Sequence, residues 1–102
     1  MAVSPAWPDG SHMTAGDQVV LPSSSTGNVG LWLMYEDRCE VDVTYDHVPS
    51  GTVARLAGSY CLVNGEPYAK LQFSSGQQKR LQMQSSGNTW LPVKELKRKP
   101  DK

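Results

Sequence analysis

Apolar and polar residues along this chain alternate in short runs that are separated by turns rich in Gly, Pro, Ser and Asn. The clearest alternation lies in residues 39–46 (CEVDVTYD), where odd-numbered positions are Cys, Val or Tyr and even-numbered positions are polar. Successive side chains of a strand point to opposite faces, so this period of two predicts a half-buried strand. We expect Val43 to face the core, while Glu40, Asp42 and Asp46 form an acidic, solvated face.

A hairpin is predicted in residues 60–73 (YCLVNGEPYAKLQF), where Asn64-Gly65 joins two apolar runs. Both central residues of a type I′ hairpin turn need a positive φ, which Asn and Gly adopt most readily. Pro67 falls at the mouth of the second strand, where it does not have to donate a hydrogen bond to a central ladder.

The other apolar runs have the same short, turn-bounded form. They predict strands over residues 17–21, 30–36, 52–57, 79–84 and 89–93. Residues 94–99 (KELKRK) are the one segment expected to form a short helical turn, and Pro100 ends it. Short strands at this spacing form an antiparallel meander that closes on itself to hide its edges. We therefore expect an all-β fold, a small antiparallel barrel.

Composition is that of an ordinary domain, with 38% hydrophobic and 20% charged residues in a chain of 102 residues and no net charge. The charge is divided between the two halves. Residues 1–50 carry seven acids and one base, a net of −6, whereas residues 51–102 carry nine bases and three acids, a net of +6. Such a division steers charged partners to one face, unless folding brings the two halves together and cancels it.

The cysteines and the chain ends bear on the cellular compartment. Cys39 and Cys61 lie within apolar patterns and lack a metal-binding spacing, so we expect two buried thiols in a reducing compartment, with one disulfide as the alternative. No apolar run is long enough to span a bilayer and no secretory signal is recognised, so we expect a cytoplasmic protein without a membrane partner.

Residues 1–13 (MAVSPAWPDGSHM) have no periodic pattern, and GSHM is similar to the remnant of a cloning site. We expect this segment to be an expression tag or a disordered leader. Residues 14–97 would form a single barrel domain, and residues 98–102 a basic tail.

The order AGDQVVL, SGTVARL, YAKLQF, KRLQM and WLPVKEL resembles the SH3-like barrels of the KOW and Tudor type. These domains often show a Gly-Asp-x-Val first strand, a Gly-x-Val second strand, a strand ending in an aromatic residue, and a closing Leu. The matching positions are Gly16, Asp17, Val19, Gly51, Val53, Phe73 and Leu96. The resemblance covers residues 15–97 and implies an SH3-like barrel with an inserted hairpin in the first long loop, residues 23–48.

A second resemblance is to the biotinyl carrier domains, through PSGTVARL and NGEPYAKLQF. That family places a Met-Lys-Met hairpin after the second segment, but this chain has SSGQQKRLQM there. The resemblance therefore implies an alternative fold without a modified lysine.

Catalytic chemistry has little support in the sequence, because His47 is the one histidine outside the leader and is expected in an exposed turn. The acidic row of residues 39–46 is typical of a solvated strand face, and SSSTGNVG lacks the ending of a phosphate-binding loop. We expect no enzyme activity, no cofactor and no metal site.

Binding is the function that the residues favour. Tudor-type barrels hold methylated Lys or Arg between aromatic rings, SH3-type barrels grip polyproline, and KOW-like domains contact RNA or DNA-bound machinery. For a protein partner, the candidate residues are Trp32, Tyr35, Glu40, Asp42, Tyr45 and Asp46. For nucleic acid, the alternative, they are Lys79, Arg80, Trp90, Lys94, Lys97 and Arg98. A third alternative is a small enzyme or carrier without a recognisable site, and the edge of the 30–46 hairpin could also pair two copies.

Overall fold

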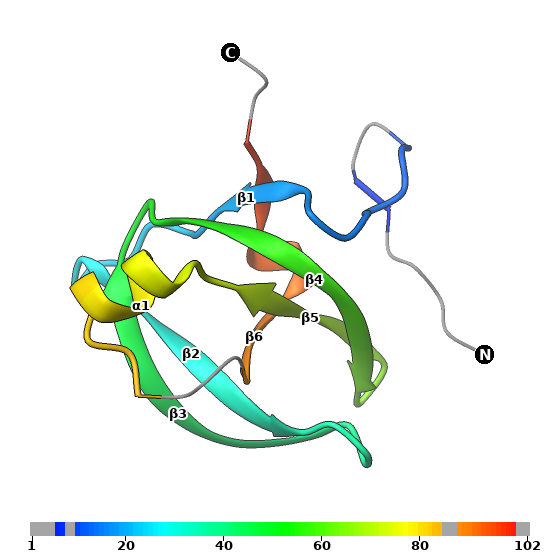
Figure 1. Cartoon of the computed structure of the whole chain (residues 1–102). Coiled ribbons are helices and arrows are strands. Elements are labelled where there is room, and N and C mark those ends of the chain that lie inside the picture. The colour runs from blue at the N-terminus through cyan, green and yellow to red at the C-terminus, as the bar shows by residue number, and fades with distance from the viewer. Residues whose placement is uncertain (1–5, 8–9, 85–87, 100–102) are drawn as a thin grey trace.

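The computed structural model describes residues 6–7, 10–84 and 88–99 and consists mainly of β-strands (Figure 1). The strands are β1 (Gln18–Val20), β2 (Asn28–Tyr35), β3 (Glu40–Pro49), β4 (Val53–Val63), β5 (Glu66–Gln72), β6 (Thr89–Pro92) and β7 (Lys97–Arg98). A short helix α1 (Ser75–Arg80) and a 3-10 turn η1 (Val93–Glu95) complete the described elements. No helix in these described ranges is sufficiently long and apolar to cross a membrane.

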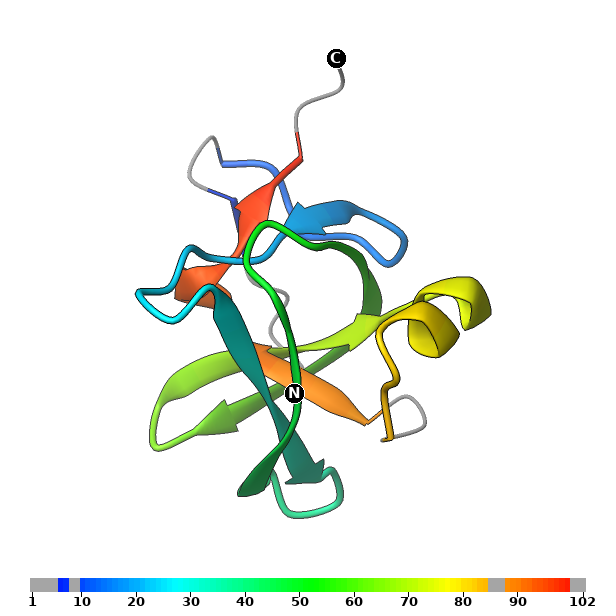
Figure 2. The same cartoon turned by 90° about the vertical axis from the view of Figure 1, so that its left-hand side faces the viewer.

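All described strands belong to one antiparallel sheet with the order β3-β2-β6-β5-β4-β1-β7. The all-β, antiparallel prediction is confirmed. The β2–β3 hairpin lies between β1 and β4 in the chain and joins the sheet through the pairing of Trp32 with Trp90. The sheet curls strongly (Figures 1 and 2), but β3 and β7 remain as its two edges, so strand pairing does not close it.

The Asn64-Gly65 hairpin forms as predicted. Val63 and Glu66 are opposite each other, and the two residues between them have φ angles of 51° and 82°. These positive values are the ones that a two-residue type I′ turn requires. The turn therefore sets the register of β4 and β5.

β4 is one long strand where the sequence predicted a break after residue 57. Its pairing with β5 is irregular between Leu56 and Tyr60, and Gly58 has a φ of 96°. Leu56 faces the main core on one side of this irregularity, whereas Cys61 belongs to a second cluster on the other side. The irregularity adds two residues of β4 without reversing the alternation, so Leu56 and Tyr60 lie on the same face of the sheet and Cys61 on the other.

Two clusters of buried side chains stabilise the sheet. The main core contains residues of β1 to β6, with Val19, Leu56 and Ala69 fully buried. The second cluster has Met34, Cys61 and Trp90 at its centre. Leu91 belongs to the main core and its neighbour Trp90 to the second cluster, so the two clusters lie on opposite faces of β6. This explains why all of β6 is buried.

Cys39 and Cys61 form a disulfide, with their Cα atoms 5.3 Å apart, which corrects the expectation of two free thiols. Cys39 is the last residue of the turn that joins β2 and β3, and its φ is 50°. Figure 1 shows this turn and the β4–β5 turn at the same end of the sheet. The two cysteines meet because both hairpins contribute to the second cluster, a proximity that their sequence separation of 22 does not indicate.

The alternation expected for residues 39–46 is wrong in part. Val43 is 50% exposed, while Asp46 is only 6% exposed. The pairing of β3 with β2 shifts register between Leu31 and Trp32 and again between Trp32 and Met34. Each shift places an extra β3 residue opposite β2, and one extra residue reverses the faces of all side chains that follow.

Residues 75–80 form helix α1, where the sequence predicted a turn leading to a strand over residues 79–84. Ser74 caps the helix by accepting a hydrogen bond from the Gln77 backbone, and the Gln77 side chain accepts one from the Ser74 backbone. This capping box satisfies two amides that would otherwise lack partners. Leu81 and Met83 still pack inward against the main core, as predicted.

The helical turn expected over residues 94–99 is shorter in the structure. It is the 3-10 turn η1, and the strand β7 follows it.

The described part of the leader is attached to the domain, although residues 1–13 were expected to lie outside it. Trp7 and Met13 are buried in the main core, and the Trp7 indole donates to Asp17 across 3.3 Å. Arg98 was expected to begin the basic tail. It lies in β7 and pairs with Val19 of β1. Residues 1–5 and 8–9 of the leader and residues 100–102 of the tail lie outside the described residues.

Candidate functional site

The outer part of the β2–β3 hairpin, residues 35–43, is the candidate surface, and we call it the hairpin surface. It contains two of the three large hydrophobic side chains that are exposed in the described chain, Tyr35 and Val43. Glu40 and Asp42 are exposed beside them. Tyr35, Glu40 and Asp42 are therefore exposed. Val43 is exposed as well, although the alternation of residues 39–46 predicted that it faces the core.

Short-range contacts order the hairpin turn. The Arg38 guanidinium lies 4.6 Å from the centre of the Tyr35 ring, and its Nε is 3.8 Å from a Glu40 carboxylate oxygen. Tyr35 and Glu40 are themselves opposite each other in the sheet. A cation above an aromatic ring is attracted by the ring's quadrupole, so Arg38 holds Tyr35 and Glu40 together at the surface.

Three longer-range contacts attach the same turn to the rest of the sheet. The first is the Cys39–Cys61 disulfide. The second is the ion pair between Lys70 and Glu36, 2.9 Å apart, and the third is the hydrogen bond from the Asn88 side chain to the Met34 carbonyl, 3.1 Å. With these attachments, the hairpin surface is ordered before any partner binds, which lowers the entropy cost of binding.

The hairpin surface carries a local negative charge. Residues 36–42 contain four acids, Glu36, Asp37, Glu40 and Asp42, and one base, Arg38, a net of −3. β3 is also an edge of the sheet, so one side of its backbone does not pair with another described strand. An edge strand exposes amide and carbonyl groups that can add a further strand.

Two residues predicted for the partner site, Asp46 and Trp32, contribute to the fold instead. The side chain of a third, Tyr45, is not among those that the structure describes. Asp46 is buried, and its carboxylate accepts a hydrogen bond of 2.8 Å from the Gln84 backbone. Its burial follows from the register shift in β3. Trp32 is half-buried and packs against both clusters, so most of its ring stabilises the fold rather than meeting a partner.

The residues predicted to bind nucleic acid do not form one patch. Lys79 and Arg80 are exposed at the end of α1, whereas Lys97 and Arg98 lie on β7, which is distant from α1 in both views (Figures 1 and 2). Trp90 is fully buried, and its indole donates to Asn88 across 2.7 Å, so it cannot stack on a base.

The remaining basic candidate is already paired, because Lys94 contacts Glu66 at 2.9 Å. This hydrogen bond to a carboxylate raises the pKa of Lys94. Nearby, burial and the charges of Glu66 and Glu95 raise the pKa of Tyr68. These groups form an ion-paired surface near η1, not a free cationic one.

The one histidine outside the leader lies in a strand of the sheet. His47 is exposed, as predicted, but it lies within β3 opposite Gly30 and not in a turn. Among the described residues, no three His, Cys, Asp or Glu side chains gather in a way that could hold a metal ion.

Comparisons of the chain with protein-family models, with curated proteins and with solved structures found no match. The functional argument therefore depends on the residues and geometry described above.

Proposed function

We propose that this protein is a non-catalytic interaction module whose hairpin surface binds an extended, basic segment of a protein partner. The observation that carries the proposal is the coincidence of an open strand edge with a local negative charge on β3. Strand addition supplies affinity through main-chain hydrogen bonds, and the side chains at alternate positions supply specificity. Negatively charged side chains along the edge favour a partner segment with Lys or Arg.

The side chains of β3 also favour an alternating pattern in the partner. Glu40 and Asp42 are two residues, or ~7 Å, apart along the strand, so basic residues at alternate positions could reach both. Val43 is 50% exposed and offers an apolar contact beside this acidic pair. A segment that alternates basic and apolar residues matches both features.

We further propose that the curled sheet is a small SH3-like barrel with an added hairpin. Without β2 and β3, the order β7-β1-β4-β5-β6 is a five-stranded antiparallel arrangement, and the hairpin extends it at β6. Interaction modules often have small barrels of this kind. The disulfide favours an oxidising compartment over the cytoplasm that we expected from the sequence, because disulfides are rare in reducing compartments.

A titration followed by NMR tests the proposed function. The probe is a peptide of about five Lys-Val repeats, long enough to extend along the free segment of β3. We expect saturable shifts of the backbone amides of residues 40–44 and about tenfold weaker binding for Asp42→Lys. The same peptide with alternate amides N-methylated should lose binding, because it cannot form the ladder.

Glu95→Lys is the matched control, since it makes the same charge change at an exposed acid on η1. An equal loss of affinity in Asp42→Lys and Glu95→Lys would show a general charge effect and contradict the proposal. Short RNA and DNA are titrated in parallel. If they shift Lys97 and Arg98 in a salt-dependent manner while the peptide shifts nothing, nucleic-acid binding is the better explanation.

A further inference from the structure

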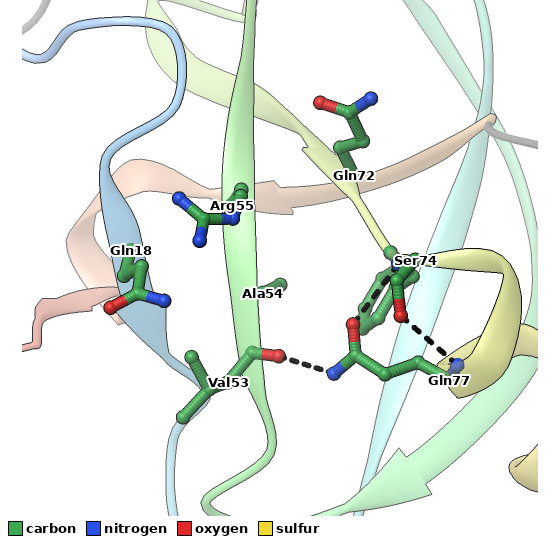
Figure 3. A pocket seen from close by; sticks show the side chains of 8 residues that line it. Gln18, Val53, Ala54, Arg55, Gln72, Ser74 and Gln77 are labelled. Atoms are coloured by element: carbon green, nitrogen blue, oxygen red, sulfur yellow. Dashed lines mark hydrogen bonds between the residues drawn. The ribbon is translucent and has the colours of Figure 1, made fainter.

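A recess lies where β1, β4 and the end of β5 meet α1 (Figure 3). Its volume is about 460 Å³, within the usual range for small-molecule sites. It is lined by Gln18, Val53, Ala54, Arg55, Gln72, Phe73, Ser74 and Gln77. Because three of these residues are glutamines, we call it the amide pocket.

A row of three polar side chains crosses the amide pocket. Arg55 in β4 is opposite Gln18 of β1 on one side and Gln72 of β5 on the other. Residues that are directly opposite in antiparallel strands project from the same face of the sheet. Their neighbours in the chain, Val19 and Ala54, are buried in the main core, so the row is on the outer face.

Gln77 closes one end of the pocket and is held in place. Its side chain replaces a backbone hydrogen bond that β5 would form with β4 if the pairing of the two strands continued. The Gln77 amide nitrogen donates to the Val53 carbonyl at 2.7 Å, and its amide oxygen accepts from the Ser74 backbone at 3.1 Å (Figure 3). This end of the pocket is therefore rigid, and Gln77 does not need a ligand to satisfy its amide.

The row of three has hydrogen-bond donors to spare. Arg55 donates to the Gly16 carbonyl at 3.0 Å, which uses one of the five N–H donors of its guanidinium. The side-chain amides of Gln18 and Gln72 form no hydrogen bond with any residue in the described ranges. No carboxylate is present among the lining residues, so the charge of the pocket is positive.

Val53 is the apolar side chain that shares the outer face with this row, whereas Ala54 and Phe73 border the pocket from the core side, where both are buried. Guanidinium binds carboxylate through two parallel hydrogen bonds, and amide N–H groups on either side can donate to the same oxygens. We propose that the amide pocket binds a small organic acid, with Arg55 on the carboxylate, Gln18 and Gln72 as flanking donors, and Val53 against the hydrocarbon part.

An NMR titration with phenylacetate tests this site, and phenylacetamide is the neutral probe of the same shape. We expect phenylacetate to produce saturable shifts of the Gln18 and Gln72 side-chain amides, and phenylacetamide to bind about tenfold more weakly because it lacks the charge. Arg55→Gln should reduce phenylacetate affinity by a similar factor. Arg55→Lys should fall between, since it keeps the charge but loses the paired hydrogen bonds.

Two further variants distinguish a specific site from general anion binding. Gln72→Glu leaves Arg55 in place but adds a carboxylate to the pocket, and it should weaken phenylacetate binding as Arg55→Gln does. Arg38→Gln removes a guanidinium from the exposed hairpin turn and should leave the affinity unchanged. Equal binding of phenylacetate and phenylacetamide, equal effects of Arg55→Gln and Arg38→Gln, or an absence of saturable shifts at the pocket would each overturn the proposal.

Discussion

Individual buried polar groups in this protein differ in whether they have a hydrogen-bond partner. The Thr89 hydroxyl donates to the Leu71 carbonyl at 3.1 Å, and the Asp46 carboxylate accepts from the Gln84 backbone. The Tyr60 hydroxyl, by contrast, is buried and has no partner among the described residues. A buried hydroxyl without a hydrogen bond loses its hydration without compensation, so it destabilises the folded state.

At this scale we predict that Tyr60→Phe leaves the free energy of unfolding unchanged or raises it by up to about 1 kcal/mol, because only the unpaired hydroxyl is removed. Urea unfolding at neutral pH measures the difference. Thr89→Val, which removes a hydroxyl that has a partner, is the control and should destabilise the protein. A clear loss of stability in Tyr60→Phe would show that its hydroxyl does have a partner in solution.

Alkaline pH gives a second measurement on the same residue. Burial and then the charge of Asp17 raise the pKa of Tyr60 above its ordinary value of about 10. The folded state therefore binds this proton more tightly than the unfolded state does. The resulting stability is complete below about pH 10 and is lost as the pH rises through the pKa of the folded state. Tyr60→Phe should lose less stability than the wild type over that interval.

At the scale of elements, α1 shows how one side chain can decide local structure. The helix is too short to be stable alone and has no buried residue. Gln77 both completes the capping box and links the helix to the Val53 carbonyl in β4. The helix is therefore maintained by its cap and by this attachment rather than by an apolar face.

We predict that Gln77→Glu lowers the free energy of unfolding by about 1–3 kcal/mol, because a carboxylate oxygen would replace the N–H donor that faces the Val53 carbonyl. The residue can still accept from the Ser74 backbone, so the change isolates the attachment to β4. Gln82→Glu adds the same charge at an exposed position and serves as the control. Equal stabilities of the two variants in thermal unfolding would contradict this role.

For the whole molecule, the notable feature is that a small sheet has a buried cluster on each face. The sheet is curled (Figure 1), and the main core and the Met34, Cys61 and Trp90 cluster lie on opposite faces of β6. The disulfide and the Glu36–Lys70 ion pair hold the β2–β3 turn beside this second cluster. The position of the hairpin surface thus depends on contacts between the β2–β3 turn and the strands β4 and β5.

Loss of the disulfide should therefore act on the whole fold. We predict that Cys39→Ala/Cys61→Ala lowers the free energy of unfolding by about 3 kcal/mol, the usual effect for a closed loop of this length. Amide exchange should accelerate most in residues 35–43, while amides near Val19 and Leu71 in the main core remain better protected. Urea unfolding of the oxidised wild type and the double variant measures the first effect. A reductant should destabilise the wild type and leave the variant unchanged.

Much of the strand content could be read from local sequence signals. The Asn64-Gly65 turn forms as predicted because the positive φ values that it needs are a property of these two residues. Runs of apolar residues likewise identified most strands, since they reflect burial of neighbouring side chains. Of the candidate surface, Glu40 and Asp42 were predicted from the polar face of an alternating strand, and Tyr35 because it and Trp32 lie on opposite sides of the strand's pleat, so that at least one of them faces outward.

The other features depend on residues that are distant in the chain. Register shifts against β2 place Val43 outward and Asp46 inward, although the alternation within residues 39–46 indicates the reverse. The disulfide and the row across the amide pocket likewise join separate strands. Local periodicity reports whether a segment is suited to be a strand, whereas strand pairing sets its register and the face that each side chain occupies. The sequence therefore specified strands and turns, and the packing of the sheet assigned the surfaces available for binding.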